Sequence, residues 1–391
     1  MIKIEKKEEC CGCGACKSIC NHNAISFEID NEGFWYPHID LDKCVDCKLC
    51  ESVCPFIGKN KSKLKQSKVY AAKCLNIKQQ KNSSSGGIFP CIAQYILEIG
   101  GVVFGTVYDG PIVKHSYIDK LEDLYKICGS KYVQSDNFSS FKNVRSFLKA
   151  GKTVLYSGTP CQCLALRKYL KKEYERLYIV DIVCHGVPSP LVWNHYLNDV
   201  SRKNNDDIKN ISFIKFKYKD GKKYLWSHPG FIIKWKNGTC FETYSNMTGY
   251  ENGYLSNLFV RPSCHTCKVK KISSESDMTI GDFWGCERII PKFNDPNGVS
   301  VVFTNTEKGI LLLSLINKKL KLAKVSISEA TKYNFRIKQS SCPHPNRIRF
   351  FNALNKSNAS IDEIVEEYIN LNLFQRIVFK LQNVIKNVFY N

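Results

Sequence analysis

The sequence lacks several features that would place it in other classes of protein. No stretch approaches the roughly 18 consecutive apolar residues of a membrane span, so no transmembrane segment is expected. No GxGxxG fingerprint is present, which disfavours a nicotinamide site of the Rossmann type. No nucleic-acid-binding module is recognisable, although the formal charge is +21, with 57 basic and 36 acidic side chains. We therefore expect no nucleic acid, and anionic partners such as acidic electron carriers or phosphorylated substrates.

Cysteine, in contrast, is abundant, with 20 residues. In a short secreted chain this number would suggest a disulfide scaffold. Here the first residues, MIKIEKKEE, are charged and do not resemble a signal peptide. We expect a cytoplasmic location, because thiolates stay free to bind metal in a reducing compartment.

Two runs of four cysteines share the spacing C-x2-C-x2-C-x3-C, and the second run ends in Cys-Pro. They are Cys10, Cys13, Cys16 and Cys20, then Cys44, Cys47, Cys50 and Cys54. This spacing is typical of bacterial ferredoxins with two 4Fe-4S clusters, in which the fourth cysteine of each run binds the other cluster. It predicts one cluster on Cys10, Cys13, Cys16 and Cys54, and a second on Cys44, Cys47, Cys50 and Cys20. Zinc is the alternative that C-x2-C pairs leave open. Cys11 falls outside the spacing and is expected to be a bystander.

The chain as a whole is expected to be an α+β protein, in which a ferredoxin-like dicluster module precedes an α/β domain with a mixed sheet and a helical C-terminal tail. Residues 1–57 form the cluster module, and the polar, basic stretch 58–68 reads as a linker. Strand 152–157, a turn at 158–162, a helix and strand 177–183 predict a βαβ unit with parallel pairing. Strand-like segments at 211–244 follow, including 222–228, with hairpin signals at Asp220–Gly221 and Asn237–Gly238.

The C-terminal segment is mostly helical, and its last part is basic and amphipathic. That part, LFQRIVFKLQNVIKNVFYN, would make peripheral contact with a membrane surface or would dock on a protein.

Two loops have the composition of phosphate or flavin sites. The segment Asn82–Gly87 (NSSSGG) opens a helix, where hydroxyls and free backbone N–H groups bind anions, although serines are also common as plain helix caps. The segment 158–162 (GTPCQ) joins a strand to a helix, the position at which α/β sheets bind phosphates. Thr159 is expected to cap that helix, with Pro160 in its first turn.

Four further cysteines lie near such loops: Cys161, Cys184, Cys264 and Cys267. If the loops converge on one crevice, these thiols would hold a third 4Fe-4S cluster, and the alternatives are a zinc site or buried thiols that bind nothing. His185 and His265 flank these cysteines and are either proton donors or ordinary loop histidines.

Several separated segments together resemble one family, the beta subunit of coenzyme F-420 hydrogenase/dehydrogenase. In chain order they are SSSGGIFPCIAQYILEIGGVVFGTVYD, GSKYVQSD, GKTVLYSGTPCQCLALRKYL, DIVCHGVPSPLVW, RPSCHTCK and SDMTIGDFWG, all within residues 70 to 305. Similar proteins often carry a dicluster ferredoxin module in front. The resemblance implies an N-terminal domain of the beta-subunit type at 69–148, a C-terminal flavin and iron–sulfur domain at 149–320, and a C-terminal helical extension at 321–391.

The resemblance also implies one FAD and an additional 4Fe-4S cluster. By position, the flavin would be lined by Ser84, Ser85, Gly86, Gly87, Gly158, Thr159 and Gln162. Cys161, Cys184, Cys264 and Cys267 would hold the additional cluster, with Asp282 and Trp284 nearby. Cys163 stands where an apolar residue is expected and competes with Cys161 as a ligand. The resemblance selects no substrate, whether deazaflavin or another organic acceptor.

The leading hypothesis is an iron–sulfur flavin-dependent oxidoreductase. Single electrons from a ferredoxin or another redox protein would pass through the clusters to FAD, which would exchange a hydride with a small-molecule or deazaflavin substrate. The alternative is an electron-transfer subunit without a substrate of its own, docked to a separate catalytic partner. A redox sensor ranks last, because it leaves the NSSSGG and GTPCQ loops without a role.

Overall fold

The computed structural model describes residues 1–57, 67–270 and 275–371. The linker expected at 58–68 falls largely outside these residues, as does the basic amphipathic part of the C-terminal segment, which begins at 373. The segment boundaries expected from the sequence stay predictions. Among the helices of the described residues, none is both long and apolar enough to cross a membrane.

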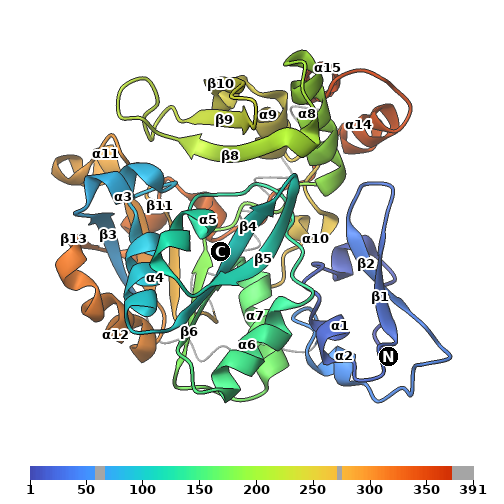
Figure 1. Ribbon diagram of the computed structural model, residues 1–391, viewed down its shortest axis with the longest axis horizontal. Helices are drawn as coiled ribbons and strands as arrows, with labels where there is room; N and C mark the ends of the chain where they lie inside the picture. Colours follow the sequence, from blue (N-terminus) through green and yellow to red (C-terminus); the bar gives the residue numbers. More distant parts are fainter. Residues whose placement is uncertain (58–66, 271–274, 372–391) are drawn as a thin grey trace.

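The N-terminal module is a small unit beside the main body of the molecule (Figure 1). Each cysteine run leads into a short helix, α1 (Ala15–Ile19) or α2 (Leu49–Ser52). Between the runs, β1 (Ile25–Ile29) and β2 (Trp35–Ile39) form an antiparallel hairpin. Helix α1 packs on helices α6 and α7 of the main body, and so the first run faces inward.

An eight-stranded mixed sheet forms the centre of the main body. Its order is β13-β3-β12-β11-β7-β6-β4-β5. The strands are β3 (Lys68–Cys74), β4 (Val102–Asp109), β5 (Ile112–Ile118), β6 (Val154–Gly158), β7 (Leu177–Ile182), β11 (Met278–Asp282), β12 (Ser300–Thr304) and β13 (Leu320–Val325). Strands β4, β6, β7 and β11 run parallel, which confirms the predicted βαβ unit β6-α7-β7. The other pairings are antiparallel.

Helices cover both faces of this sheet, and the strands are apolar on both faces as a consequence. The core on one face joins α4 and α12 to alternate strand residues such as Val103 and Leu155. The core on the other face joins α6 and α7 to Val102 and Val154. The helices with sheet contacts are α3 (Ile77–Asn82), α4 (Ile88–Glu98), α5 (Leu124–Ile127), α6 (Ser140–Lys149), α7 (Pro160–Leu170), α12 (Glu307–Leu315) and α13 (Ile327–Thr331).

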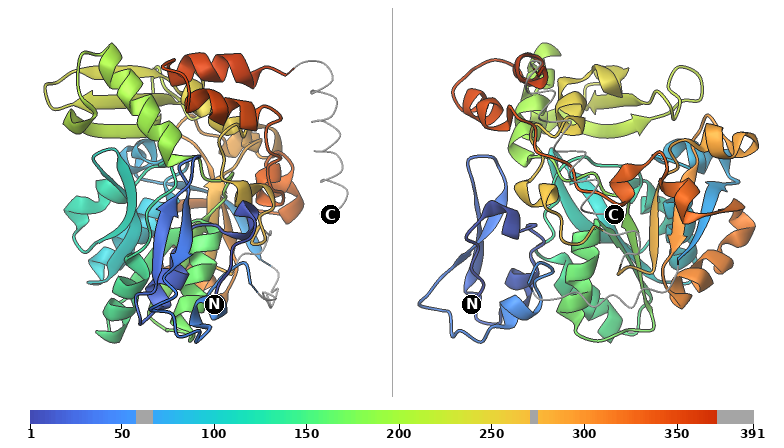
Figure 2. Two further views of the ribbon diagram at one scale, coloured as in Figure 1. Left: turned by 90° about the vertical axis from the view of Figure 1, so that its right-hand side faces the viewer. Right: turned by 180° about the vertical axis from the view of Figure 1, so that it is seen from behind.

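A second layer lies over one end of the sheet, as both views in Figure 2 show. It holds the three-stranded antiparallel sheet β8 (Ile211–Tyr218), β9 (Gly230–Trp235) and β10 (Cys240–Tyr244). Its helices are α8 (Pro190–Lys203), α9 (Gly249–Leu255), α14 (Arg347–Leu354) and α15 (Ile361–Ile369), and they share one aromatic-rich core with this sheet. Helices α10 (Pro262–His265) and α11 (Cys286–Ile289) complete the set of described α-helices.

Two local sequence predictions in this layer meet different outcomes. The turn at Asn237–Gly238 does connect β9 to β10, with Gly238 at φ +92. The strand predicted at 222–228 is wrong, because these residues form bends and coil in a long connection between β8 and β9. Asp220 explains this difference, since its carboxylate accepts the backbone N–H groups of Lys222 and Tyr224 and closes a local turn instead of a hairpin.

Candidate functional site

The carboxyl ends of three parallel strands meet beneath the second layer. Strand β6 ends at Gly158, β7 at Ile182 and β11 at Asp282. The loops that follow these strands line two adjoining cavities. This is the edge of an open α/β sheet at which ligands ordinarily bind.

One set of four cysteines lies at the outer end of the module. Cys20, Cys44, Cys47 and Cys50 together line one cavity there, and these are the four thiols that the spacing assigns to one cluster. Cys47 is exposed, whereas Cys50 is buried and its sulfur accepts the backbone N–H of Ile2 at 3.4 Å. We call these four residues the outer set.

Cys10, Cys13, Cys16 and Cys54 form the inner set, on the side of the module that faces the main body. Burial raises the pKa of the Cys16 thiol well above its ordinary value, and the neighbouring thiols Cys10 and Cys54 raise it further. The backbone N–H of Gly12 donates to the Cys10 sulfur at 3.4 Å. Such N–H···S contacts are among the features that tune iron–sulfur clusters.

The third set consists of Cys161, Cys184, Cys264 and Cys267, which line one cavity at the edge of the sheet. Cys161 lies in the first turn of α7 and Cys184 in the loop after β7, while Cys264 and Cys267 belong to α10 and the residues that follow it. Burial raises the pKa of the Cys184 thiol to about 12. Thiols in this environment keep their protons until a metal replaces them.

Cys11 and Cys163 lie in different environments, the first at a cavity and the second in the apolar core. Cys11, expected to be a bystander, lines the cavity of the third set and contacts both Cys13 and Cys161. It therefore lies between the inner set and the third set. Cys163 is 1% exposed and points into the apolar core between α7 and the sheet. Cys161, rather than Cys163, faces the cavity.

The larger cavity measures about 490 Å³, within the usual range for small-molecule and cofactor sites. Six of the seven residues expected to line the flavin line this cavity: Ser84, Ser85, Gly87, Gly158, Thr159 and Gln162. Gly86 is not among the lining residues. Its backbone packs against β3 and β12 so closely that an added Cβ would lie 2.4 Å from the carbonyl oxygen of Ala72.

The serine-rich loop is held by its own hydroxyls. Ser84 Oγ accepts the backbone N–H of Ser130 at 2.7 Å, and Ser85 Oγ donates to the carbonyl of Val299 at 2.9 Å. Helix α4 begins after Gly87, which has φ +87 and provides no side-chain cap. The plain-capping alternative for the serines is therefore wrong, because no serine side chain caps α4.

The GTPCQ turn forms the cap that the sequence predicts. Thr159 caps α7 in a capping box with Gln162, and Pro160 occupies the first turn. The Gln162 side-chain amide also donates to Ser135 Oγ at 3.1 Å. The same Ser135 hydroxyl bonds Nδ1 of the buried His115 at 2.9 Å, so one network fixes this wall of the cavity.

Three charged residues of the larger cavity, Lys131, Lys217 and Glu251, were not singled out from the sequence. Lys131 lines it and donates to the carbonyls of Cys128 and Gly129 at 3.3 and 3.4 Å. Within the described residues no carboxylate forms an ion pair with Lys131. Burial lowers the pKa of this lysine to about 8. Lys131 lies in the GSKYVQSD segment, which could have drawn attention to it, but the burial of a side chain cannot be read from one sequence.

A second charged group of the cavity joins β8, β11 and α9. Lys217 forms an ion pair with Asp282, whose other oxygen accepts the indole N–H of Trp226 at 3.0 Å. Glu251 lies nearby, 7% exposed, and its Oε2 has no hydrogen-bond partner among the described residues. Burial raises the pKa of the Glu251 carboxyl.

The expected position of Asp282 and Trp284 needs a correction. Both line the larger cavity and are absent from the lining of the third set's cavity. Strand β11 ends at Asp282 and directs the residues that follow toward β8 and Trp226, and Trp284 stacks on Trp226 with ring centroids 5.0 Å apart. His185 lines both cavities and bonds Asn257, while His265 bonds the carbonyl of Ser341.

A dicluster cysteine module on a mixed α/β body defines the class of the protein, an iron–sulfur electron-transfer protein. Comparison with known families agrees: residues 9–57 match the 4Fe-4S dicluster domain, and residues 151–330 match the C terminus of the coenzyme F420 hydrogenase/dehydrogenase beta subunit. The chain thus matches this family's C-terminal model behind a match to the dicluster domain, which confirms the resemblance and supports two 4Fe-4S clusters.

Individual relatives cover different parts of the chain. One subunit of the F(420)H(2) dehydrogenase of Methanosarcina mazei is 21% identical over 242 residues, covering 56% of this chain and 67% of that protein. A ferredoxin of Methanocaldococcus jannaschii is 35% identical over 52 residues, covering 13% of this chain and 66% of that protein. A chain of the F420-reducing NiFe hydrogenase complex of Methanosarcina barkeri aligns over 81% of this chain and 90% of its own length, with 17% identity and a TM-score of 0.44.

Proposed function

We propose that this chain is an oxidoreductase that carries electrons between a redox protein and a flavin in the larger cavity. Electrons would pass from the outer set through the inner set and the third set, each holding one 4Fe-4S cluster. One observation carries the proposal: Cys184 lines both the cavity of the third set and the larger cavity. A cluster on Cys184 would therefore adjoin any ligand of the larger cavity.

The chemistry of the donor sets fits iron–sulfur clusters. In the described residues, no three His, Cys, Asp or Glu side chains converge closely enough to hold a single metal ion. The thiols of each set nevertheless share a cavity or alter each other's pKa. A four-iron cube needs this wider spacing, because each thiolate binds a separate iron at its own corner. The spacing favours clusters over zinc.

The larger cavity fits a planar, phosphorylated cofactor such as FAD. Lys131, which has no carboxylate partner within the described part of the chain, offers a positive charge close to the Ser84–Ser130 hydroxyls. This combination suits a phosphate group. The start of α4 lacks a side-chain cap and leaves backbone N–H groups for the same purpose. When bound, a flavin would combine two single electrons with a proton to supply a hydride.

Glu251 is the residue best placed to handle the accompanying proton. Burial raises the pKa of this carboxyl, and the residue lines the cavity, with its Oε2 lacking a hydrogen-bond partner among the described residues. The Lys217 cation acts on this carboxyl and would stabilise the carboxylate left after the proton moves to a substrate heteroatom. Replacement Glu251→Gln is expected to slow substrate reduction while leaving the flavin content unchanged.

Anaerobic purification with iron, sulfide and flavin quantified per chain tests the proposal. About twelve irons and one FAD are expected, as three 4Fe-4S clusters and a flavin require. Cys184→Ser should lower iron to about eight, whereas Cys163→Ser, in the apolar core, should leave it unchanged. About eight irons and no flavin in the unaltered chain would contradict both the third cluster and the flavin site.

A second candidate function is an electron-transfer subunit with no substrate of its own. The name of one relative favours it, because that protein is one subunit of a dehydrogenase. An isolated chain that reduces small organic acceptors, deazaflavin among them, would support the enzyme. A flavin-loaded chain that turns over only after a second polypeptide is added would support the subunit.

A further inference from the structure

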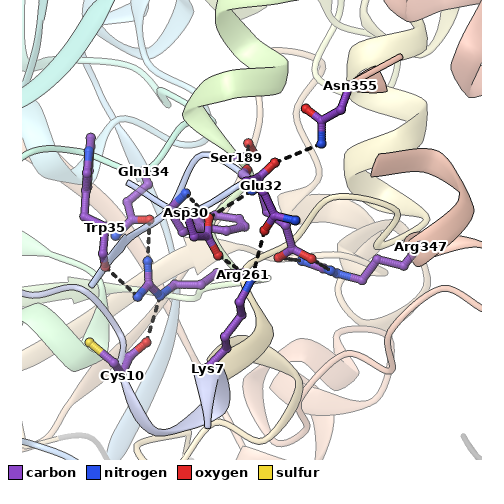
Figure 3. A network of polar contacts seen from close by, with 12 residues as sticks. Lys7, Cys10, Asp30, Glu32, Trp35, Gln134, Ser189, Arg261, Arg347 and Asn355 are labelled. Carbon is purple, nitrogen blue, oxygen red and sulfur yellow. Dashed lines mark hydrogen bonds and ion pairs between the residues drawn. The ribbon is translucent and has the colours of Figure 1, made fainter. Parts of the chain in front are cut away.

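Arg261 lies where the module meets the main body. It directly precedes α10 and is 0% exposed (Figure 3). Cys10 and the β1–β2 hairpin flank it on the module's side, and Gln134 flanks it on the body's side. The rings of Phe34 and Tyr36 lie 5.3 and 4.4 Å from the guanidinium carbon.

All three hydrogen bonds recorded for this guanidinium go to neutral acceptors. Nε donates to the carbonyl of Cys10 at 2.8 Å, and Nη2 donates to the carbonyl of Trp35 at 2.9 Å. Nη1 donates to Gln134 Oε1 at 3.0 Å. Within the described residues, Arg261 has no ion pair with a carboxylate.

Arg347 provides the contrast at the same interface. It is also buried, and its guanidinium donates to both carboxylate oxygens of Glu32, on the hairpin of the module. Figure 3 shows both arginines, Arg347 forked onto the Glu32 carboxylate and Arg261 donating to the oxygens of Cys10, Trp35 and Gln134. Both arginines join the module to the body, but of the two only Arg347 has its charge balanced by a side chain.

A buried charge without a counter-charge costs several kcal/mol. Arginine cannot avoid this cost by losing its proton. The titratable groups that act on Arg261 with opposite potential charge are the Cys10 thiol, the Tyr36 phenol, and the thiols of Cys11 and Cys264. A 4Fe-4S cluster with four thiolate ligands carries a net negative charge, which grows by one when the cluster is reduced.

We propose that Arg261 is the counter-charge of the inner 4Fe-4S cluster and raises the reduction potential of that cluster. A positive charge in a dry interface stabilises the reduced, more negative state more than the oxidised state. The inner cluster would thereby draw electrons from the outer one. The proposal requires only the dicluster module, so it stands independently of the flavin and the third set.

The neighbouring Gly12 is consistent with close approach of the cluster loop to this cation. Gly12 has φ +68, which disfavours other residues. An added Cβ would lie 2.4 Å from Gln134 Nε2 and 3.0 Å from Arg261 Nη1. The loop can thus rest directly on the guanidinium and its amide partner.

The test is a redox titration of the full chain, monitored by electron paramagnetic resonance. Arg261→Gln is expected to shift the equilibrium between the reduced and oxidised forms of one 4Fe-4S cluster at least tenfold toward the oxidised form. For a one-electron couple, this shift lowers the reduction potential by about 59 mV. Arg261→Lys keeps the charge and should retain most of the potential. The double replacement of Arg347→Gln with Glu32→Gln, which loosens the same interface by removing both charges of the pair together, should leave the couples unchanged.

A second variant keeps the test informative if Arg261→Gln does not fold. Gln134→Glu preserves size and places a carboxylate beside Nη1, so it should lower the same potential. The proposal is overturned if Gln134→Glu leaves every couple unchanged, if Arg261→Gln shifts the couples no more than the double replacement at Arg347 and Glu32 does, or if Arg261→Lys lowers the potential as far as Arg261→Gln. The last result would assign Arg261 a purely geometric role.

Discussion

The outer and inner sets derive from the same repeated spacing, yet the structure gives them different surroundings. Three of the inner thiols, Cys13, Cys16 and Cys54, are buried at 7 to 9% exposure against the body. In the outer set Cys47 is exposed and Cys44 is half-buried. The repeated cysteine spacing determines how each run would bind a cluster. The packing of α1 on α6 and α7 determines which groups of the chain surround each cluster.

Their neighbours differ in the same way. Cys11 and Arg261 connect the inner set to the body. The outer set has exposed apolar side chains beside it, Leu41 at 67% and Val45 at 60%. On the route proposed above, the inner set exchanges electrons within the chain and the outer set exchanges them with a partner protein. Four pairs of matched variants test this difference between the two sides of the module.

The largest effect is expected from the matched replacements Cys13→Ser and Cys47→Ser, at equivalent positions of the two runs. Each should remove about four irons and block reduction of the body by a reduced ferredoxin. Cys13→Ser should also lower the melting temperature, because it leaves the buried Arg261 charge unbalanced. Iron analysis and anaerobic calorimetry measure both effects. Equal melting temperatures in the two variants would remove the energetic distinction between the sets.

Ion pairs on the two sides of the module should also differ. Glu32→Gln breaks the buried pair with Arg347 and should lower the free energy of unfolding by about 3 to 5 kcal/mol. Asp40→Asn breaks the exposed pair with Lys43 and should have no measurable effect on stability. Denaturant unfolding of both variants measures this difference. A Glu32→Gln chain as stable as the unaltered one would show that the docking interface does not depend on this pair.

Acid should weaken the body more than the module. Burial lowers the pKa of His115 to about 4, whereas both histidines of the module, His22 and His38, are exposed. Between about pH 6.5 and 4, His115 is protonated in the unfolded chain but stays neutral in the folded chain. Lowering the pH through this window therefore reduces the free energy of unfolding by about 3 kcal/mol in total. His115→Gln should flatten this slope in pH-dependent unfolding, and His38→Gln should not. An unchanged slope in His115→Gln would assign the loss to other groups.

The smallest effect concerns the exposed rim of the outer set. Val45→Asp should slow electron exchange with a reduced ferredoxin a few-fold, because it places a charge in the apolar contact. Ile29→Asp, equally exposed on β1 at 68%, is the control and should leave the rate unchanged. Stopped-flow kinetics measure the rate of electron exchange with the reduced ferredoxin for both variants. If both variants react at the rate of the unaltered chain, the partner approaches from elsewhere.

Local chemistry explains which features the sequence could predict. The cysteine spacings, the capping box at Thr159 and the βαβ unit each depend on neighbours a few residues apart, and all appear in the structure. The distinction between Cys161 and Cys163 followed only from the packing of α7, whose opposite sides face the cavity and the core.

Tertiary contacts explain what the sequence could not provide. Arg261 lies within a recognised motif, but its burial depends on Trp35 and Gln134, which are distant in the chain. Glu251 and Lys131 owe their altered pKa to burial beneath the second layer. The false strand at 222–228 alternates like a strand but has no neighbouring strand among the described residues with which to pair.

The position of β3 in the sheet has a consequence for biosynthesis. This strand lies between β12 and β13, although it precedes both by more than two hundred residues. During synthesis this sheet therefore cannot be completed before β13 is made, whereas both cysteine runs of the module are made before any strand of the sheet. The thiols of the outer and inner sets are thus available for metal before Cys264 and Cys267 have been added to the chain.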